Sequence, residues 1–254
     1  MNGVLNFPFP VFDTLDGIFG FLPAALRVAL FGGLSGALTM AVYRWSSNQE
    51  RIRSYKEEMG RIRRALKAAA DDLGETMRLS RANLGVSFRL LGTVTGPALL
   101  ASLPILFVIV WVATRYGWET PPPASPVAIT FEPAREGVVV EPPDALKVAG
   151  EKLFLRWPAA PGEIRFRDGK GVIYAGPPPE PGNDVVHKPL WWNLLLGNEM
   201  GYLREDAAIE AIRFELAPRR LIPAGPGWLA GWEGIYFGSL LLTSLLLKIV
   251  FRID

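Results

Sequence analysis

The longest run without a charged residue is the feature that most constrains this chain. Between Arg89 and Arg115 lie 25 residues that carry no charge, and most of them are apolar. A helix needs roughly 20 apolar residues to cross the ~30 Å hydrocarbon core of a bilayer. The run therefore predicts a membrane span on length alone.

Two further apolar runs flank this one. The first is interrupted only by Arg27. The last has a charge-free core of 14 residues, Gly234–Leu247, so Glu233 and Lys248 must extend to opposite interfaces if it spans. We expect an α-helical membrane protein with three transmembrane helices, over residues 22–43, 90–115 and 228–251.

The N-terminal segment differs from a secretory signal, which begins with positive charge. Its first 26 residues contain no Lys or Arg and two acids, Asp13 and Asp16. The apolar residues of segment 1–21 favour an interfacial element that leads into the first span. A disordered tail is the alternative.

Charge sidedness predicts the orientation. Residues 44–89 contain 11 Lys or Arg against 6 Asp or Glu, and basic loops stay in the cytoplasm. The N-terminus is then outside, residues 116–227 are extracytoplasmic, and the tail 252–254 is cytoplasmic. We expect an integral protein of a prokaryotic plasma (inner) membrane, with the lipid bilayer as its first partner.

The cytoplasmic loop carries a coiled-coil pattern. Apolar residues at alternating spacings of three and four predict one stripe of a helical hairpin, over Ile52, Tyr55, Met59, Ile62, Leu66, Ala69 and Leu73. Gly74 is the expected break between its two legs. The outer face is basic and could contact a ribosome or anionic lipid, although part of this charge only sets topology: Arg51, Arg53, Lys56, Arg61, Arg63, Arg64 and Lys67.

The outer segment is rich in proline and predicts an inserted domain, a small β-sandwich or β-rich fold, from about residue 125 to about residue 175. Short strand-like runs occur at Val127–Phe131, Gly137–Val140, Lys152–Trp157, Glu163–Arg167 and Gly171–Tyr174. Asp168-Gly169 is a hairpin turn signal. Ala207–Leu216 predicts a final strand or a short helix. Trp191 and Trp192 form an apolar patch for a partner or the membrane surface.

The order of these parts resembles the YidC-type insertase superfamily, above all its compact three-span branch of archaeal YidC-like proteins and endoplasmic-reticulum insertase subunits. Gly33–Arg64 (GLSGALTMAVYRWSSNQERIRSYKEEMGRIRR) is similar to that branch's passage from first helix into coiled coil. Gly227–Ile253 (GWLAGWEGIYFGSLLLTSLLLKIVFRI) is similar to its last span. The resemblance covers roughly residues 22–116 and 227–254, and the long outer segment departs from it.

The resemblance implies a hydrophilic groove within the membrane, often with a positive residue in the first helix. Polar side chains on the three predicted spans are the candidates for such a groove: Arg27, Ser35, Thr39, Thr93, Thr95, Ser102, Ser239 and Thr243. Two alternatives remain. In the first, Arg27 extends to the lipid headgroups and lines no groove. In the second, the small residues, together with Gly32-x-x-x-Gly36, serve helix packing.

The sequence favours no enzyme. The chain has no cysteine and one histidine, which leaves no thiolate nucleophile and no His-cluster metal site. We expect no catalytic residue, metal, cofactor or small-molecule substrate.

Two functions fit this reading. One is an insertase-like membrane chaperone that acts on client membrane proteins. The other is a non-enzymatic scaffold or accessory subunit that binds a membrane complex through its extracytoplasmic domain. A transporter or channel fits less well, because the predicted spans hold no ionisable residue at mid-depth.

Single introduced cysteines test the orientation, because the chain has none of its own. In intact cells a membrane-impermeant maleimide should label Gly150→Cys and leave Gly60→Cys unlabelled until the membrane is opened. Labelling at 60 from outside, or protection at 150, would contradict the topology.

Overall fold

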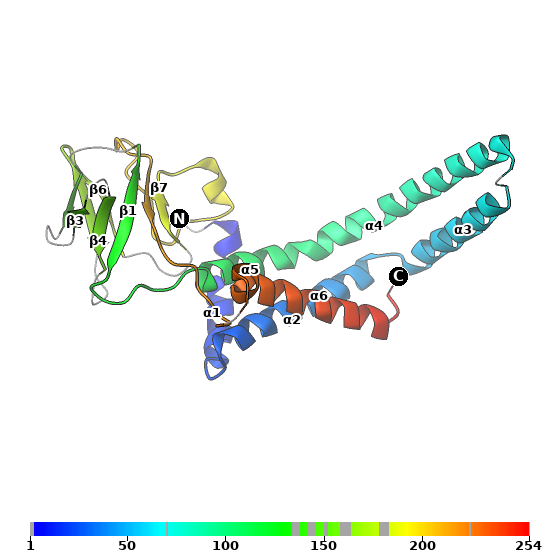
Figure 1. Ribbon diagram of the computed structural model, residues 1–254, viewed down its shortest axis with the longest axis horizontal. Coiled ribbons are helices and arrows are strands. Elements are labelled where there is room, and N and C mark those ends of the chain that lie inside the picture. Colours follow the sequence, from blue (N-terminus) through cyan, green and yellow to red (C-terminus); the bar gives the residue numbers. More distant parts are fainter. Residues whose placement is uncertain are drawn as a thin grey trace. The chain divides into compact units, whose positions relative to one another are not determined.

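The computed structural model describes residues 3–69, 71–133, 138–141, 146–149, 152–157, 164–177, 183–223 and 225–253 (Figure 1). The chain divides into two compact units, each built from two separated stretches. The β unit comprises Met1–Val28 and Phe107–Ile235, and the helical unit comprises Ala29–Leu106 and Tyr236–Asp254.

Three helices are long and apolar enough to cross a membrane, as predicted: α2 (Ala24–Ser46), α4 (Leu73–Tyr116) and α6 (Trp232–Val250). The last begins four residues after the predicted start. There the short helix α5 (Gly227–Ala230) ends, and Gly231 is extended. Pro97 and Pro104 lie inside α4 without ending it.

The N-terminal segment is folded over its described residues, so the disordered alternative is wrong for them. A 3-10 turn, η1 (Val4–Asn6), precedes helix α1 (Phe9–Ile18). Pro10 occupies the first turn of α1, where its missing N–H costs nothing. The interfacial position of this segment stays a prediction.

A helical arm belongs to the helical unit. Asn48 caps the N-terminus of helix α3 (Gln49–Ala68), because its side chain accepts a hydrogen bond from the Arg51 N–H at 2.9 Å. Figure 1 shows α3 and the first half of α4 joined by a short turn and running in opposite directions. Ile52 of α3 and Leu79 and Val86 of α4 are buried, so each leg presents an apolar face that is covered.

The break between the two legs lies before Gly74. Helix α3 ends at Ala68, and the Asp72 side chain accepts a hydrogen bond from the Glu75 N–H at 3.0 Å at the start of α4. Gly74 is therefore inside the new helix. Leu73, the last predicted residue of the α3 stripe, is 86% exposed because it starts α4 instead.

The β unit contains two antiparallel sheets. One has the order β3-β4-β1-β8-β7, and the other has the order β2-β5-β6. Their strands are β1 (Pro126–Glu132), β2 (Val139–Glu141), β3 (Leu146–Ala149), β4 (Lys152–Arg156), β5 (Ile164–Asp168), β6 (Gly171–Gly176), β7 (Val185–His187) and β8 (Ala211–Phe214).

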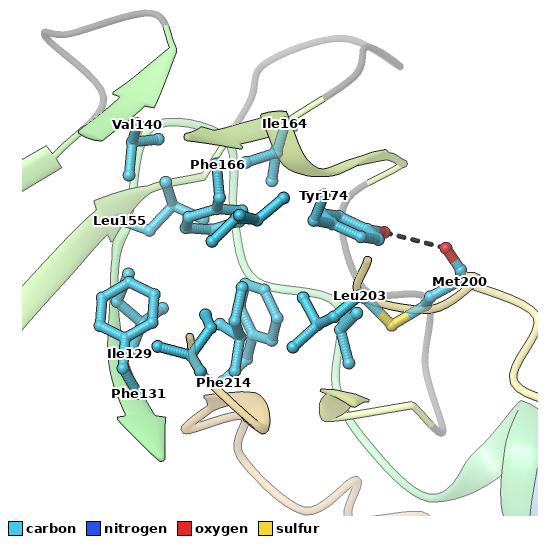
Figure 2. Packing of buried hydrophobic residues seen from close by; sticks show 14 of the residues in the cluster. Ile129, Phe131, Val140, Leu155, Ile164, Phe166, Tyr174, Met200, Leu203 and Phe214 are labelled. Carbon is cyan, nitrogen blue, oxygen red and sulfur yellow. Dashed lines mark hydrogen bonds between the residues drawn. The ribbon is translucent and has the colours of Figure 1, made fainter. Parts of the chain in front are cut away.

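Aromatic rings fill the core of this unit (Figure 2). Phe166 of β5 is fully buried, and its ring centroid lies 5.9 Å from that of Phe131 and 6.4 Å from that of Phe214. The Tyr174 hydroxyl donates a hydrogen bond to the Met200 carbonyl at 3.0 Å, which satisfies its buried polar end. Burial raises the pKa of Tyr174 to about 12.

The sheets extend further along the chain than predicted. The β-rich region was expected to end near residue 175, yet β8 pairs with both β1 and β7 inside the five-stranded sheet. The strand alternative for Ala207–Leu216 is confirmed. The Asp168-Gly169 hairpin is also confirmed, with the Lys170 N–H donating to Asp168 at 2.8 Å. Gly137 and Glu163, which begin two predicted runs, lie outside the described residues.

Truncation of Phe166 should unfold the β unit at lower temperature. Phe166→Ala removes a ring that contacts both sheets, and such core truncations cost about 3–5 kcal/mol. Thermal unfolding of the purified chain, followed by protease resistance of the β unit, measures the effect. Val172→Ala on β6 is the matched control, because Val172 is 39% exposed. Equal shifts for both variants would contradict the core assignment.

Candidate functional site

Close backbone contact joins α2 and α6 in the helical unit. A Cβ added at Gly32 would lie 2.1 Å from the Ser239 Oγ, and one at Gly36 would lie 2.6 Å from the Leu240 carbonyl oxygen. Only glycine allows this approach, which is the small-residue packing seen between membrane helices.

Four groove candidates lie along this α2–α6 contact. Ser35 is buried, and its Oγ accepts a hydrogen bond from the Tyr236 hydroxyl at 3.0 Å. A Cβ at Gly33 would lie 3.3 Å from the Thr243 Oγ1, and the Ser239 and Thr39 hydroxyls donate to carbonyls of their own helices. Ser35, Ser239 and Thr243 thus lie where α2 and α6 meet, an arrangement compatible with the packing alternative.

Three groove candidates lie elsewhere on α4, where Thr95 is exposed and Thr93 and Ser102 are half-buried. The Thr93, Thr95 and Ser102 hydroxyls each donate to a carbonyl of their own helix at 2.7–2.8 Å. Thr95 and Ser102 are seven residues apart and therefore share one face of the helix. Because each hydroxyl still has an oxygen able to accept, this face is weakly polar within an apolar helix.

Arg27, the charged groove candidate, belongs to the β unit. Its guanidinium forms an ion pair with Asp16 of α1, and both side chains are largely buried. The guanidinium carbon also lies 5.6 Å from the ring centroid of Tyr116, whose hydroxyl donates to the same carboxylate. The charge of Arg27 is thus neutralised by Asp16, which lowers the free-energy cost of burying the guanidinium.

A second acid of α1 holds the end of α4. The Arg115 guanidinium donates two hydrogen bonds of 2.9 Å to the Asp13 carboxylate and one of 2.7 Å to Glu199. The Trp111 indole N–H also donates to Asp13, at 2.8 Å. The Arg115 hydrogen bonds hold the pKa of Asp13 below its ordinary value of 3.8.

Sequence reasoning missed these pairs. Asp13 and Asp16 served there only as evidence against a signal peptide. The available signal was their spacing of three on a helix, which places both carboxylates on the same side.

The predicted basic face is exposed along α3. All seven basic residues of α3 are exposed, whereas the apolar stripe from Ile52 to Ala69 is buried or half-buried. The helix therefore separates its charges from its apolar side, as the heptad pattern indicates.

The two tryptophans of the predicted patch have different surroundings. Trp191, in the 3-10 turn η3 (Trp191–Leu194), is 79% exposed. Trp192 turns inward, and its ring centroid lies 5.1 Å from that of His187, which in turn packs against Tyr202. Only Trp191 is presented as a surface contact.

Among the described residues, no group of three or more His, Cys, Asp or Glu side chains is placed to hold a metal ion. Comparison of the chain with protein-family models, with curated proteins and with solved structures finds no match.

Loss of the Asp13 charge should loosen the N-terminal segment. Asp13→Asn keeps the shape but weakens the Arg115 pair, at a cost of roughly 1 kcal/mol because Asp13 is partly solvated. The stability that the Asp13–Arg115 ion pair contributes should also vanish in acid. Since the folded pKa of Asp13 is lowered, its stabilisation is complete above its unfolded pKa and is lost as pH falls through the folded value.

Protease cleavage within residues 3–23 measures this loosening, and it should rise in Asp13→Asn at neutral pH and below pH 3.8 in the unchanged chain. Glu75→Gln is the control, because Glu75 makes a comparable ion pair with Arg78 on the arm. If Glu75→Gln exposed the N-terminal segment as much as Asp13→Asn, the pair with Arg115 would not be its anchor.

Proposed function

We propose that the chain is an insertase-like membrane chaperone, which helps short polar segments of client membrane proteins across the bilayer. In this proposal the N-terminus and the β unit's strands are extracytoplasmic, the arm is cytoplasmic, and the membrane is a prokaryotic plasma membrane. The three apolar helices and the basic residues of segment 44–89 support this orientation.

The observation that carries the proposal is the uninterrupted course of α4. Residues 73–106 of this helix belong to one unit and run without interruption from the arm into the second candidate span. A client that contacts the arm is thereby led along a helix on which the exposed Thr95 and the half-buried Ser102 share one face. In hydrocarbon these hydroxyls offer hydrogen bonds that lipid lacks, which lowers the cost of a passing polar group.

The arm supplies the first contact. We propose that α3 and the first leg of α4 form an antiparallel coiled coil, in keeping with the covered apolar stripes. Its exposed arginines and lysines would contact a ribosome or anionic lipid, each basic residue contributing ~1 kcal/mol of attraction near an anionic membrane. No nucleotide is required, because burial of the client's apolar helix in lipid drives the reaction.

A second candidate function is a scaffold or accessory subunit of a membrane complex. The observation that favours it is the aromatic core of the β unit, which packs the two sheets into a rigid body that a partner could bind. A scaffold of this kind would bind its partner without promoting insertion.

An insertion assay separates the two functions. The full chain in vesicles should increase protease protection of a newly made single-span client with a short charged translocated end. Thr95→Val with Ser102→Ala should lower this yield roughly eightfold, because two membrane hydrogen bonds at an average of about 0.6 kcal/mol each sum to about 1.2 kcal/mol. A client with an uncharged end should be affected little.

Ser87→Ala is the matched control, because its hydroxyl makes the same bond to its own helix, to Asn83, outside the predicted span. Unchanged insertion by the full chain across several clients would refute the chaperone and leave the scaffold.

A further inference from the structure

An apolar groove opens between the N-terminal segment and the loop that carries Trp191. It has a volume of about 1070 Å³, near the upper end of ordinary ligand pockets. One wall is η1 with the start of α1, and the other is the stretch from Pro189 to Leu194 with Tyr202. Both walls belong to the β unit.

The two walls are fastened to each other. The Leu5 N–H donates to the Leu195 carbonyl at 2.8 Å, and the Gly197 N–H donates to the buried Asn6 side chain at 2.7 Å. A Cβ at Gly3 would lie 2.4 Å from the Gly197 nitrogen, so the backbones meet as closely as glycine permits. The groove is thus a built feature of the fold.

Large apolar side chains line the groove and point outward. Phe7 is 85% exposed on one wall, opposite the exposed Trp191 and Leu194 on the other. The apolar surface continues along α1 through the exposed Val11 and Ile18, which lie seven residues apart and therefore share one face of that helix.

Among the described residues, those that line the groove carry no charge. The two acids among residues 3–23 are Asp13 and Asp16, and both are bound by arginines. On the other wall the nearest charge, Lys188, pairs with Glu210 at 3.0 Å. Water therefore hydrates this face poorly, and the transfer of the face from water into an apolar medium is favourable in free energy.

Chain continuity identifies that medium. Helix α2 begins at Ala24 and has 23 residues, so it is about 35 Å long and only slightly exceeds the ~30 Å hydrocarbon core. If α2 spans the bilayer, its first turn lies at the hydrocarbon boundary. Phe21, three residues earlier and strongly exposed, then lies at the interface together with the apolar face of α1.

We propose that this groove and the apolar face of α1 are immersed in the bilayer surface, with lipid acyl chains filling the groove between Phe7 and Trp191. The ligand class is the acyl chain of a bilayer lipid, in the leaflet where the first span begins. Trp191 anchors at the interface as membrane-belt tryptophans do, with its ring in the apolar layer and its indole N–H near water. The inference concerns anchoring and is independent of insertion.

Contact quenching tests the proposal. Because the chain has no cysteine, Trp191→Cys, Phe7→Cys and Val172→Cys can each carry one fluorophore. The full chain is reconstituted in phosphatidylcholine–phosphatidylglycerol vesicles with or without bromine on the acyl chains. Fluorescence at 191 and 7 should fall by roughly half with brominated chains, since interfacial faces lie about 5–10 Å into the headgroup–acyl boundary. The control at 172, on hairpin strand β6, should not change.

Equal fluorescence at 191 in the two kinds of vesicle would overturn the proposal. So would an oxidative disulfide between two Trp191→Cys chains in vesicles, which would show a second copy on this face. Leu194→Cys, on the same wall, provides an independent label if position 191 disturbs the fold. Insertion activity measured on the same vesicles shows whether the proposed chaperone function stands or falls separately.

Discussion

Neutralisation of charge by the N-terminal helix is the interaction on which the β unit depends. An arginine near the start of α2 and another near the end of α4 sit beside long apolar segments, where unpaired charge is costly. Asp16 binds Arg27 and Asp13 binds Arg115, both from one helix of ten residues. These pairs hold α1 in place and turn its apolar face outward, and that face forms part of the groove.

Packing of α2 against α6 follows from a different constraint. Apolar side chains do not drive helices together in lipid, so close backbone approach and small polar contacts must do so. Gly32 and Gly36 provide the approach, and the Tyr236–Ser35 hydrogen bond satisfies a buried hydroxyl pair. Hydroxyls used in this way are unavailable to a client, so the proposed function relies on Thr95 and Ser102 of α4.

The β unit joins elements that are far apart in sequence. Strand β8 lies some eighty residues after β1 and pairs with it, and Asn6 binds Gly197 across almost the whole chain. Two features of the β unit have distinct roles in the proposals. The aromatic core gives rigidity, and the groove beside Trp191 gives an apolar surface without charge.

Local pattern was sufficient for the helices and the arm. Apolar length predicted three helices long enough to span a membrane, alternating spacings of three and four predicted the covered stripe of α3, and Asp168-Gly169 predicted a hairpin, because each depends on neighbours within a few residues. The tertiary structure decided the rest. It alone showed that β8 enters the first sheet, that Trp192 turns inward while Trp191 stays exposed, and that Asp13 and Asp16 bind two arginines. Those outcomes depend on which distant residues meet, and no local periodicity specifies that.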